Sequence, residues 1–412
     1  DGNVAADHEY DEDATSETST LAYSQEPYAT FQDKASELSH QLFPYSADIK
    51  LDRMKGGSSN RVIGITTSGR KMKKYSCDWF RTQFKDMISL KHDEPEKYVL
   101  RIPRWESVSM EAVIATLKVI GDRAQIPTPR VIAYSLSEGN VLGKPYMLQP
   151  RLPGLSLNTV YDSLNLEQKK CVARQITKLI PDIATITSGS AGTISASNLA
   201  NNGSSDIEVS RFPICDPMDD PSFTPSIAET PLEFMLGQCE RWREYEEASG
   251  MAWHNIWDAF SEISESLQKY GFLEDSGFCL AHGDLLDYNL LVEIRGSTSV
   301  EITAVLDWDC AAFVPSFVAY RAPFWQWIND NEPDYDETLA NKVPETDAQM
   351  ACKAVFEEMA SEKFKRFAFA PEAVFARRMF KILKDGIFSD QILDETKKII
   401  RGWDELHPED DI

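Results

Sequence analysis

The sequence predicts an α+β fold in two lobes, with a small N-terminal sheet and a larger, mainly helical C-terminal part. Short β-branched and aromatic runs separated by turn residues dominate from about residue 47 to 150. Long segments with helical spacing dominate after residue 164, interrupted by a strand-turn-strand pattern near 278–306. A chain of 412 residues with 42% hydrophobic residues is long enough to bury two such cores.

The expected domain organisation has four segments. Residues 1–30 contain eight Asp or Glu and no Lys or Arg, which indicates an acidic flexible tail; a docking arm is the alternative. Residues 31–150 are expected to form the N-terminal lobe, and residues 151–405 the helical C-terminal lobe. Residues 406–412 read as a second short acidic tail.

The N-terminal lobe begins with helical spacing over residues 31–46, followed by a strand, a glycine-rich loop and another strand. The loop contains Gly56, Gly57, Ser58 and Asn60. Glycines let a backbone approach phosphate oxygens because no Cβ intervenes, although a plain hairpin turn is the alternative. The polar, basic stretch 67–96 is expected to be an exposed insertion.

Three further strands and a helix complete the predicted sheet. The strand 98–103 carries one internal cation, Arg101, whose burial would be costly without a partner. An amphipathic helix is expected over 109–120, with Glu111 in its first turn. Residues 127–134 and 145–149 read as the last strands, with a tight turn at Gly139-Asn140.

Composition bears on partners and compartment. The net charge of −24 disfavours nonspecific binding to nucleic acid or an anionic membrane, and no apolar run approaches a membrane span. The seven cysteines are scattered without a C-x-x-C pair, which favours a reducing compartment, and a cytoplasmic location is expected. The chain begins at Asp1, so removal of an upstream targeting segment stays open. The oligomeric state is not encoded in any pattern.

Residues 279–312 hold the most specific pattern in the chain. His282-Gly283-Asp284 precedes Asn289, and a strand, a Gly-Ser turn and a second strand then lead to Asp307. Antiparallel pairing would bring Asn289 and Asp307 to the same end of this hairpin, with Asp284 on the loop before it. Two carboxylates and an amide oxygen at one edge suit phosphoryl transfer, since Mg²⁺ prefers hard oxygen ligands. An ordinary buried hairpin is the structural alternative.

The spacing of Asp284 and Asn289 resembles the catalytic loop of protein kinases, with Gly283 in place of its Arg. The pattern H-G-D-L with a later L-D-W resembles the aminoglycoside phosphotransferase and choline kinase superfamily, including its fungal branch, from about residue 47 to 404. The resemblance implies a protein-kinase-like fold, ATP and Mg²⁺ as cofactors, and a small-molecule acceptor. The sequence lacks a D-F-G motif and a recognisable activation segment, which disfavours a true protein kinase.

The resemblance also implies roles for individual residues of the C-terminal lobe. Asp284 would orient the acceptor hydroxyl and take its proton, while Asn289 and Asp307 would hold Mg²⁺. His282 is expected to buttress the loop, and Asp309 to lie close to the metal or the substrate.

In the N-terminal lobe the resemblance implies nucleotide binding. Arg101 would contact the α- and β-phosphates, paired by Glu111, with Arg104 as the rival cation. The residues Gly56, Gly57, Ser58 and Asn60 would cover the phosphates. Met147 or Leu148 would line the adenine pocket, whose edge would meet the backbone from Gln149 to Arg151.

The C-terminal lobe is expected to open with a helix over 164–186, capped by Asn165 and Gln168. A long irregular region over 187–228 and an aromatic segment over 313–327 are where the resemblance implies acceptor specificity; plain core packing is the alternative for the aromatic residues. Two further helices are expected over 232–270, and two or three over 348–404.

The expected activity is therefore transfer of the γ-phosphate of ATP to a hydroxyl of a small molecule. A non-catalytic nucleotide-binding protein on the same fold is the alternative. The identity of the acceptor is not encoded in any recognisable pattern.

Overall fold

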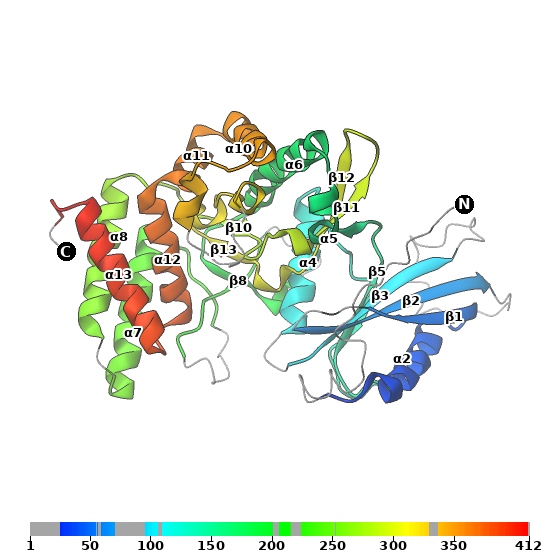
Figure 1. Ribbon diagram of the computed structural model, residues 1–412. Coiled ribbons are helices and arrows are strands. Elements are labelled where there is room, and N and C mark those ends of the chain that lie inside the picture. The colour runs from blue at the N-terminus through cyan, green and yellow to red at the C-terminus, as the bar shows by residue number, and fades with distance from the viewer. Residues whose placement is uncertain are drawn as a thin grey trace. The chain divides into compact units, whose positions relative to one another are not determined.

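The computed structural model describes residues 25–54, 56, 59–70, 95–105, 109–200, 206–215, 224–251, 253–328 and 337–410. The chain divides into two compact units, one made of residues up to Glu111 with Pro129–Arg151, the other of Ala112–Thr128 with Leu152–Ile412 (Figure 1). We call them the first and the second unit and describe each by itself.

The first unit is built on a five-stranded antiparallel sheet in the order β1-β2-β3-β5-β4. The strands are β1 (Ser46–Arg53), β2 (Asn60–Arg70), β3 (Glu96–Pro103), β4 (Ala133–Ser135) and β5 (Tyr146–Pro150). With the mainly helical second unit, this sheet confirms the α+β fold class. Residues 136–145 join β4 and β5, and the connection turns at Asn140, whose carbonyl oxygen accepts from the Gly143 N–H at 3.0 Å. The Asn140 side chain organises the connection by donating to Ser137 O and Lys144 O.

One face of the sheet carries the hydrophobic core of the first unit. Helix α2 (Tyr28–Leu42) covers this face with Phe31, Ala35 and Leu38, which are spaced one and two turns apart. The helix begins before the expected residue 31 and ends before 46, and β1 starts at Ser46. The sheet residues of this core include Leu100 and Leu148.

The opposite face of the same sheet receives the alternate residues of each strand. Arg101 pairs with Met147 across β3 and β5, and Val99 pairs with Gln149. Met147 and Gln149 are both buried. Leu148 lies in the α2 core, so Met147 is the one of the two adenine-pocket candidates that shares a face with Arg101.

The second unit contains α4 (Met110–Arg123), apart from its first two residues, and most of the helices. They are α5 (Leu157–Val160), α6 (Leu166–Ala184), α7 (Pro231–Ser249), α8 (His254–Lys269), α9 (Ser316–Ala319), α10 (Asp347–Met359), α11 (Glu362–Phe369), α12 (Pro371–Asp385) and α13 (Asp390–Leu406). The described residues 348–404 thus hold four helices, not two or three, because short connections at Ala360 and Ala370 break the apolar periodicity. Helix α6 has the expected capping box, formed by Asn165 and Gln168.

The region 187–228, expected to be irregular, contributes strands to a second five-stranded sheet. The order is β7-β10-β13-β8-β9, with β7 (Thr187–Ser188), β8 (Gly192–Ile194), β9 (Val209–Ser210), β10 (Phe278–Ala281) and β13 (Ala312–Val314). The expectation was wrong because strands of two or three residues have no periodicity of their own and are fixed by pairing with β10 and β13. Gly192 is required here, since a Cβ would lie 1.9 Å from Ser210 O.

The aromatic segment after β13 is chiefly core. Phe313, Phe317 and Trp327 are fully buried. Arg377 of α12 donates to Phe317 O and so joins the helical layer to this segment. Core packing therefore accounts for these three aromatic residues.

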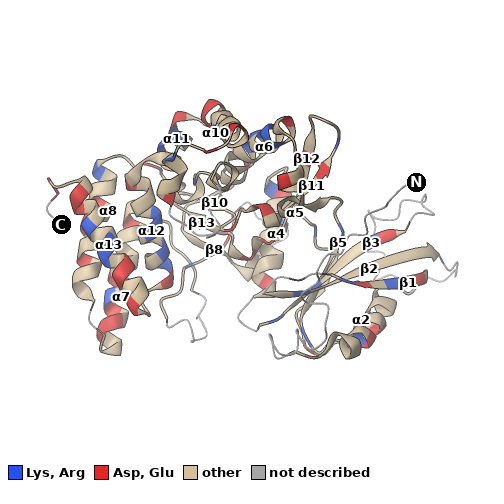
Figure 2. Ribbon diagram, viewed as in Figure 1, with Lys and Arg blue, Asp and Glu red and all other residues tan. Residues whose placement is uncertain are grey.

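Helices α7, α8, α12 and α13 pack against one another, and acidic and basic residues are interspersed on their surfaces (Figure 2). The expected acidic tail after residue 405 is wrong for its described part. Asp410 accepts from Lys269 at 2.8 Å, and Glu409 accepts from Tyr270 at 2.6 Å, because the end of α8 presents these donors.

The described residues include no helix that is both long and apolar enough to cross a membrane.

Candidate active site

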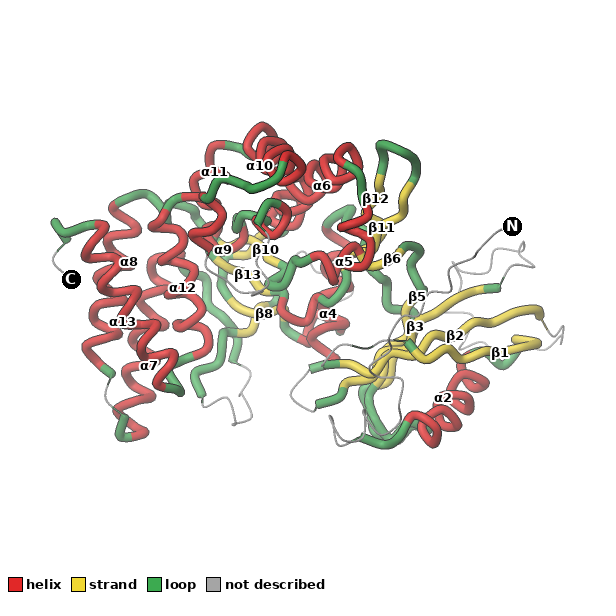
Figure 3. The backbone as a smooth tube through the Cα atoms, viewed as in Figure 1, coloured by secondary structure: helices red, strands yellow, loops and turns green. Residues whose placement is uncertain are grey.

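The site is built at one end of the hairpin β11 (Leu290–Ile294) and β12 (Val300–Val305), which pairs with β6 (Leu155–Ser156) in a three-stranded sheet (Figure 3). Leu290 pairs with Val305, so the residues that flank this pair meet. The Leu306 N–H donates to Asn289 O at 2.8 Å and extends the pairing by one step. Asn289 and Asp307 therefore lie at the same end of the hairpin, as the sequence predicts.

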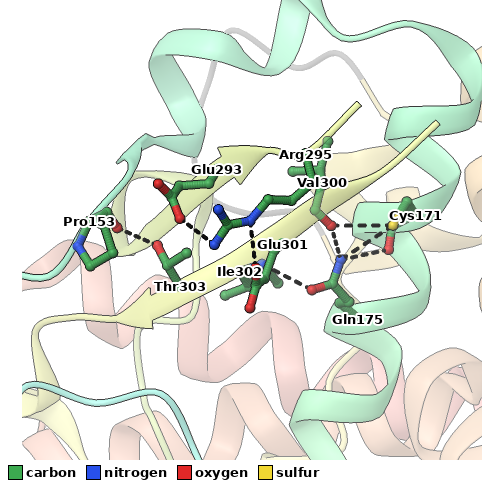
Figure 4. Close-up of polar contacts among 9 residues, drawn as sticks. All are labelled: Pro153, Cys171, Gln175, Glu293, Arg295, Val300, Glu301, Ile302 and Thr303. Atoms are coloured by element: carbon green, nitrogen blue, oxygen red, sulfur yellow. Dashed lines mark hydrogen bonds and ion pairs between the residues drawn. The ribbon is translucent and has the colours of Figure 1, made fainter. Parts of the chain in front are cut away.

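The far end of the hairpin is fixed to helix α6 through Gln175 (Figure 4). Its Nε2 donates to Val300 O at 2.6 Å, and its Oε1 accepts from the Ile302 N–H at 2.9 Å. Because β12 is the edge strand of its sheet, this carboxamide takes the place of a neighbouring strand. Thr303 is also tied to Pro153 O. The hairpin is thus held from both sides, which positions Asn289 and Asp307.

Asp284 lies on the loop between β10 and the 3₁₀ turn Asp287–Asn289. Its Oδ2 accepts from Asn289 Nδ2 at 2.9 Å, and Asn289 Nδ2 also donates to Asp284 O at 2.9 Å. Its Oδ1 accepts from the Tyr288 hydroxyl at 2.8 Å. Asn289 is buried, and because its Nδ2 is held in this way, its Oδ1 is the atom that remains for a cation.

His282 supports the loop from inside. Its ring is buried, and Nε2 lies 2.8 Å from Leu306 O, an acceptor, so Nε2 carries the proton. Nδ1 then accepts from the Asp284 N–H at 3.2 Å. Burial lowers the pKa of His282 below its ordinary value, which matches a neutral ring. The structure thus gives His282 the buttressing position expected from the sequence.

The loop has no room for a side chain at Gly283, the position at which protein kinases have Arg. Its φ is +84°, in the left-handed region. A Cβ at this position would lie 2.4 Å from Cys310 O. The loop bearing Asp284 therefore packs directly on the backbone of the turn that follows Asp307.

Asp307 has an unusual backbone conformation. With φ 60° and ψ 62° it is the non-glycine residue of positive φ among the described residues. Such a conformation costs of order 1–2 kcal/mol for most side chains, and Asp is among the residues that tolerate it best. It ends β12 and begins the 3₁₀ turn Trp308–Cys310. Asp309 therefore lies on a turn and not on a continuing strand.

One histidine links the two segments that bear the carboxylates. The His282 ring accepts from the Asp284 N–H and donates to Leu306 O, the carbonyl next to Asp307. The Asp284 loop also packs at Gly283 on Cys310 O, in the turn after Asp307. Asp284 and Asp307 therefore lie on adjoining segments at this end of the hairpin.

The residues expected to bind nucleotide lie in the first unit. Arg101 is half-buried and shares the non-core face of the sheet with Met147 and Gln149. Glu111 is exposed in the first turn of α4, so its pairing with Arg101 stays a prediction. Gly57 and Ser58 lie outside the described residues.

Gly56 and Asn60 belong to a loop that Arg104 holds in place. Arg104 is buried, its Nε donates to Asn60 O at 3.2 Å, and its N–H donates to Ser59 O at 2.8 Å. A Cβ on Gly56 would lie 2.4 Å from Asn60 O. Arg104 therefore has a structural role in fastening the loop, which sequence reasoning had weighed only as a rival for phosphate binding.

Sequence reasoning missed the residue Tyr288 and the side-chain environment of Gln149, a residue it had assigned to nucleotide binding. Tyr288 lies within the catalytic-loop spacing but at a position the motif leaves free, so no pattern marked its contact with Asp284. Gln149 was expected to act through its backbone. Its buried side-chain Nε2 makes no hydrogen bond, and the neighbouring Arg151 N–H already donates to Lys97 O at 2.9 Å. Such a feature has no signal in the sequence.

A carboxylate on a loop, next to an amide and a second carboxylate at the end of a hairpin, is an arrangement that suits phosphoryl transfer. The family described as phosphotransferase enzyme family matches residues 86–315, more than half of the chain. The chain belongs to this family, which confirms the resemblance seen in the sequence at the level of the family; the fungal branch stays a prediction. The matched span includes Arg101, Asp284 and Asp307, whereas the glycine-rich loop lies before it.

Solved structures of aminoglycoside phosphotransferases are distantly similar to the chain. The crystal structure of aminoglycoside phosphotransferase APH(4)-Ia is 16% identical, with a TM-score of 0.46, over 90% of this chain and 98% of that chain. The GDP complex of wild-type aminoglycoside 2'-phosphotransferase-IIIa is 12% identical, with a TM-score of 0.46, over 89% and 98%. No curated protein matched the chain.

Proposed function

We propose that the protein transfers the γ-phosphate of ATP, in a Mg²⁺-dependent reaction, to a hydroxyl of a small molecule. One observation carries the proposal: Asp284 is held by Asn289 on a loop at the hairpin end that also bears Asp307, in a chain of the phosphotransferase enzyme family. Family membership supports phosphotransfer itself, and the oxygen-rich hairpin end supports the cofactor.

In the proposed mechanism Asp284 orients the acceptor hydroxyl and takes its proton as the oxygen bonds to phosphorus. The bond between the γ-phosphorus and the leaving oxygen of ADP breaks in the same displacement. His282 contributes by fixing the Asp284 backbone, since the neutral ring accepts from its N–H and donates to Leu306 O. Arg101 is proposed to contact the phosphates from the non-core face of its sheet.

The donor set at the hairpin end fits Mg²⁺. Asn289 Oδ1 and the Asp307 carboxylate are hard oxygen ligands, and Mg²⁺ commonly takes only one or two ligands from the protein beside phosphate oxygens and water. The αL backbone of Asp307 supports this role, because strained residues concentrate at functional sites. When bound, the ion neutralises charge on the phosphate oxygens.

Asp307→Ala is expected to remove the Mg²⁺-dependent part of nucleotide binding. The melting temperature of the wild-type protein should rise more with ATP and Mg²⁺ than with ATP and EDTA. The difference reports the additional free energy of nucleotide binding that the metal ion provides. In the variant the two conditions should give the same shift. A Mg²⁺-dependent shift that survives in the variant contradicts the assignment. Glu301→Ala, which removes an exposed carboxylate from the same strand β12 but away from Asp307, is the control and should keep the Mg²⁺ dependence.

Base recognition in this proposal involves the Gln149 side chain. Pro150 has no N–H, and the Arg151 N–H donates to Lys97 O, so these two residues offer no backbone donor to a base. Gln149 lies on the same face of the sheet as Met147 and Arg101, and its Nε2 is buried without a partner. A buried amide without a partner costs free energy that a ligand acceptor would recover. We assign Nε2 as a donor to a ring nitrogen of adenine.

Gln149→Leu should therefore weaken ATP binding without lowering the stability of the fold. The similar volume keeps the packing and removes an unsatisfied donor, so the free energy of unfolding should stay equal or rise. Binding of ATP, measured by isothermal titration, should weaken about tenfold, as loss of one buried hydrogen bond predicts. Unchanged affinity would reject the role of the side chain. Gln41→Leu makes the same exchange at an exposed position of helix α2 in the same unit, and it should leave the affinity for ATP unchanged.

The activity itself is tested by incubating the protein with ATP, Mg²⁺ and a panel of amino alcohols, sugars and aminoglycosides. Acceptor-dependent ADP release is expected for at least one class. ATP-induced stabilisation without ADP release for any acceptor would favour the non-catalytic alternative.

A further inference from the structure

Tyr288 makes a contact that the proposed mechanism does not use. Its hydroxyl donates to Asp284 Oδ1 at 2.8 Å, while Asn289 Nδ2 donates to Oδ2 at 2.9 Å. Both oxygens of the carboxylate thus already accept a hydrogen bond. Each oxygen keeps a second lone pair, but hydrogen bonds from donors stabilise the charged carboxylate and lower its affinity for a proton, so the base is stronger once one donor has left.

The two donors differ in how easily they can leave. Asn289 is buried and bonds to both the backbone and the side chain of Asp284. Tyr288 is 48% exposed, on a 3₁₀ turn of three residues. The Tyr288 side chain can move into solvent without opening the loop, whereas the Asn289 side chain cannot. Oδ1 is therefore the oxygen that an acceptor would use, and the Tyr288 hydroxyl stands at the position of the acceptor hydroxyl.

Exchange of the two hydroxyls is nearly balanced in free energy. A phenol and an alcohol each donate one O–H···O bond to the same oxygen, so little is lost when one replaces the other. A single water molecule can also donate to Oδ1, but it lacks the other contacts of a bound acceptor. It competes with a tethered phenol less well than the acceptor does.

We propose that Tyr288 caps the base Asp284 until the acceptor arrives, and so suppresses transfer of the γ-phosphate to water. The inference rests on the proposed function, since it needs ATP as donor and Asp284 as base. In the suppressed reaction the water oxygen bonds to the γ-phosphorus, the bond to the ADP oxygen breaks, and the water proton passes to Asp284. The products are ADP and inorganic phosphate. Tyr288 acts through Asp284 and is a positioning residue that sets specificity for acceptor over water.

The test is ADP release by wild-type protein and Tyr288→Phe, with ATP and Mg²⁺ and without acceptor. Removing the hydroxyl alone should raise this basal release about fivefold, the population change that corresponds to one net hydrogen bond. An exposed ring keeps its packing, so the melting temperature should stay the same. The KM for an acceptor found in the panel should fall, because the acceptor no longer has to displace the phenol. If Tyr288 had only a structural role, the ratio of basal to acceptor-dependent turnover would be the same in both proteins.

Two controls accompany the variant. Tyr45→Phe removes the hydroxyl of a tyrosine with the same exposed fraction, 48%, and should leave basal release unchanged. The double variant Tyr288→Phe with Asp284→Asn should not show the increase in basal ADP release. Basal release that is equal or lower in Tyr288→Phe overturns the inference and leaves the proposed function standing. If neither the wild-type protein nor Tyr288→Phe releases ADP, the inference is also overturned. The melting-temperature shift with ATP and Mg²⁺ then shows whether the protein still binds the nucleotide.

Discussion

Asp284→Asn is expected to lower acceptor-dependent ADP release by about 10²–10⁴-fold, the range that a positioned general base contributes. The amide has nearly the shape of the carboxylate. Its oxygen can still accept from Asn289 Nδ2, and its NH₂ group can donate to the Tyr288 oxygen, so the loop should stay intact. The amide cannot take a proton from the acceptor. Nucleotide binding, measured by the melting-temperature shift with ATP and Mg²⁺, should be retained.

Asp287→Asn is the matched control for this loss. Asp287 lies on the same loop, and its Oδ2 accepts from Asn158 Nδ2 at 3.1 Å, a contact that an amide oxygen preserves. The charge change is the same, so turnover close to that of the wild type is expected. Turnover retained in Asp284→Asn would rule out Asp284 as the base.

The second large effect concerns stability. Arg377→Met is expected to lower the free energy of unfolding by about 3–5 kcal/mol, because a buried guanidinium is removed whose bonds to Glu337 and to two main-chain carbonyls are lost together, although Arg321 still pairs with Glu337 at 3.0 Å. Arg377 is buried, bonds to Glu337, and donates to Phe317 O at 2.9 Å and Phe367 O at 2.6 Å. Burial lowers the pKa of its guanidinium. The urea midpoint of unfolding, taken with its slope, measures the loss.

The neighbouring Arg378 provides the control. Its Nε lies 2.6 Å from Glu395 Oε1, and both side chains are about a third exposed. Solvent screens such a pair, so Arg378→Met should cost less than about 1 kcal/mol. Equal losses in the two variants would mean that burial of the Arg377 pair does not matter.

Much of the fold was predictable because its signals are local. Helix α6 follows from the Asn165 cap and its apolar stripe, and the hairpin β11–β12 follows from two apolar runs around a Gly-Ser turn. The strands β7, β8 and β9 were not predictable. They have two or three residues each and exist only because β10 and β13 pair with them. The contacts of Glu409 and Asp410 were missed for the same reason, since their partners lie about 140 residues away.

The sequence by itself determined the reaction class. The order and spacing of Asp284, Asn289 and Asp307 along a strand-turn-strand segment require that they meet, because antiparallel pairing leaves little choice of register once one face is buried. That is a local constraint, and the chain carries it in 24 consecutive positions, from Asp284 to Asp307.

Only the tertiary structure decided how those groups are held. The packing of Gly283 on Cys310 O, the His282 bond to Leu306 O and the Gln175 bridge to β12 each join segments that no sequence pattern links. The same holds for the Tyr288 hydroxyl on Asp284 and for the unpartnered Gln149 Nε2. Hydrogen-bond geometry depends on positions within a few tenths of an ångström, and those positions are set by packing of the whole unit and not by residue order.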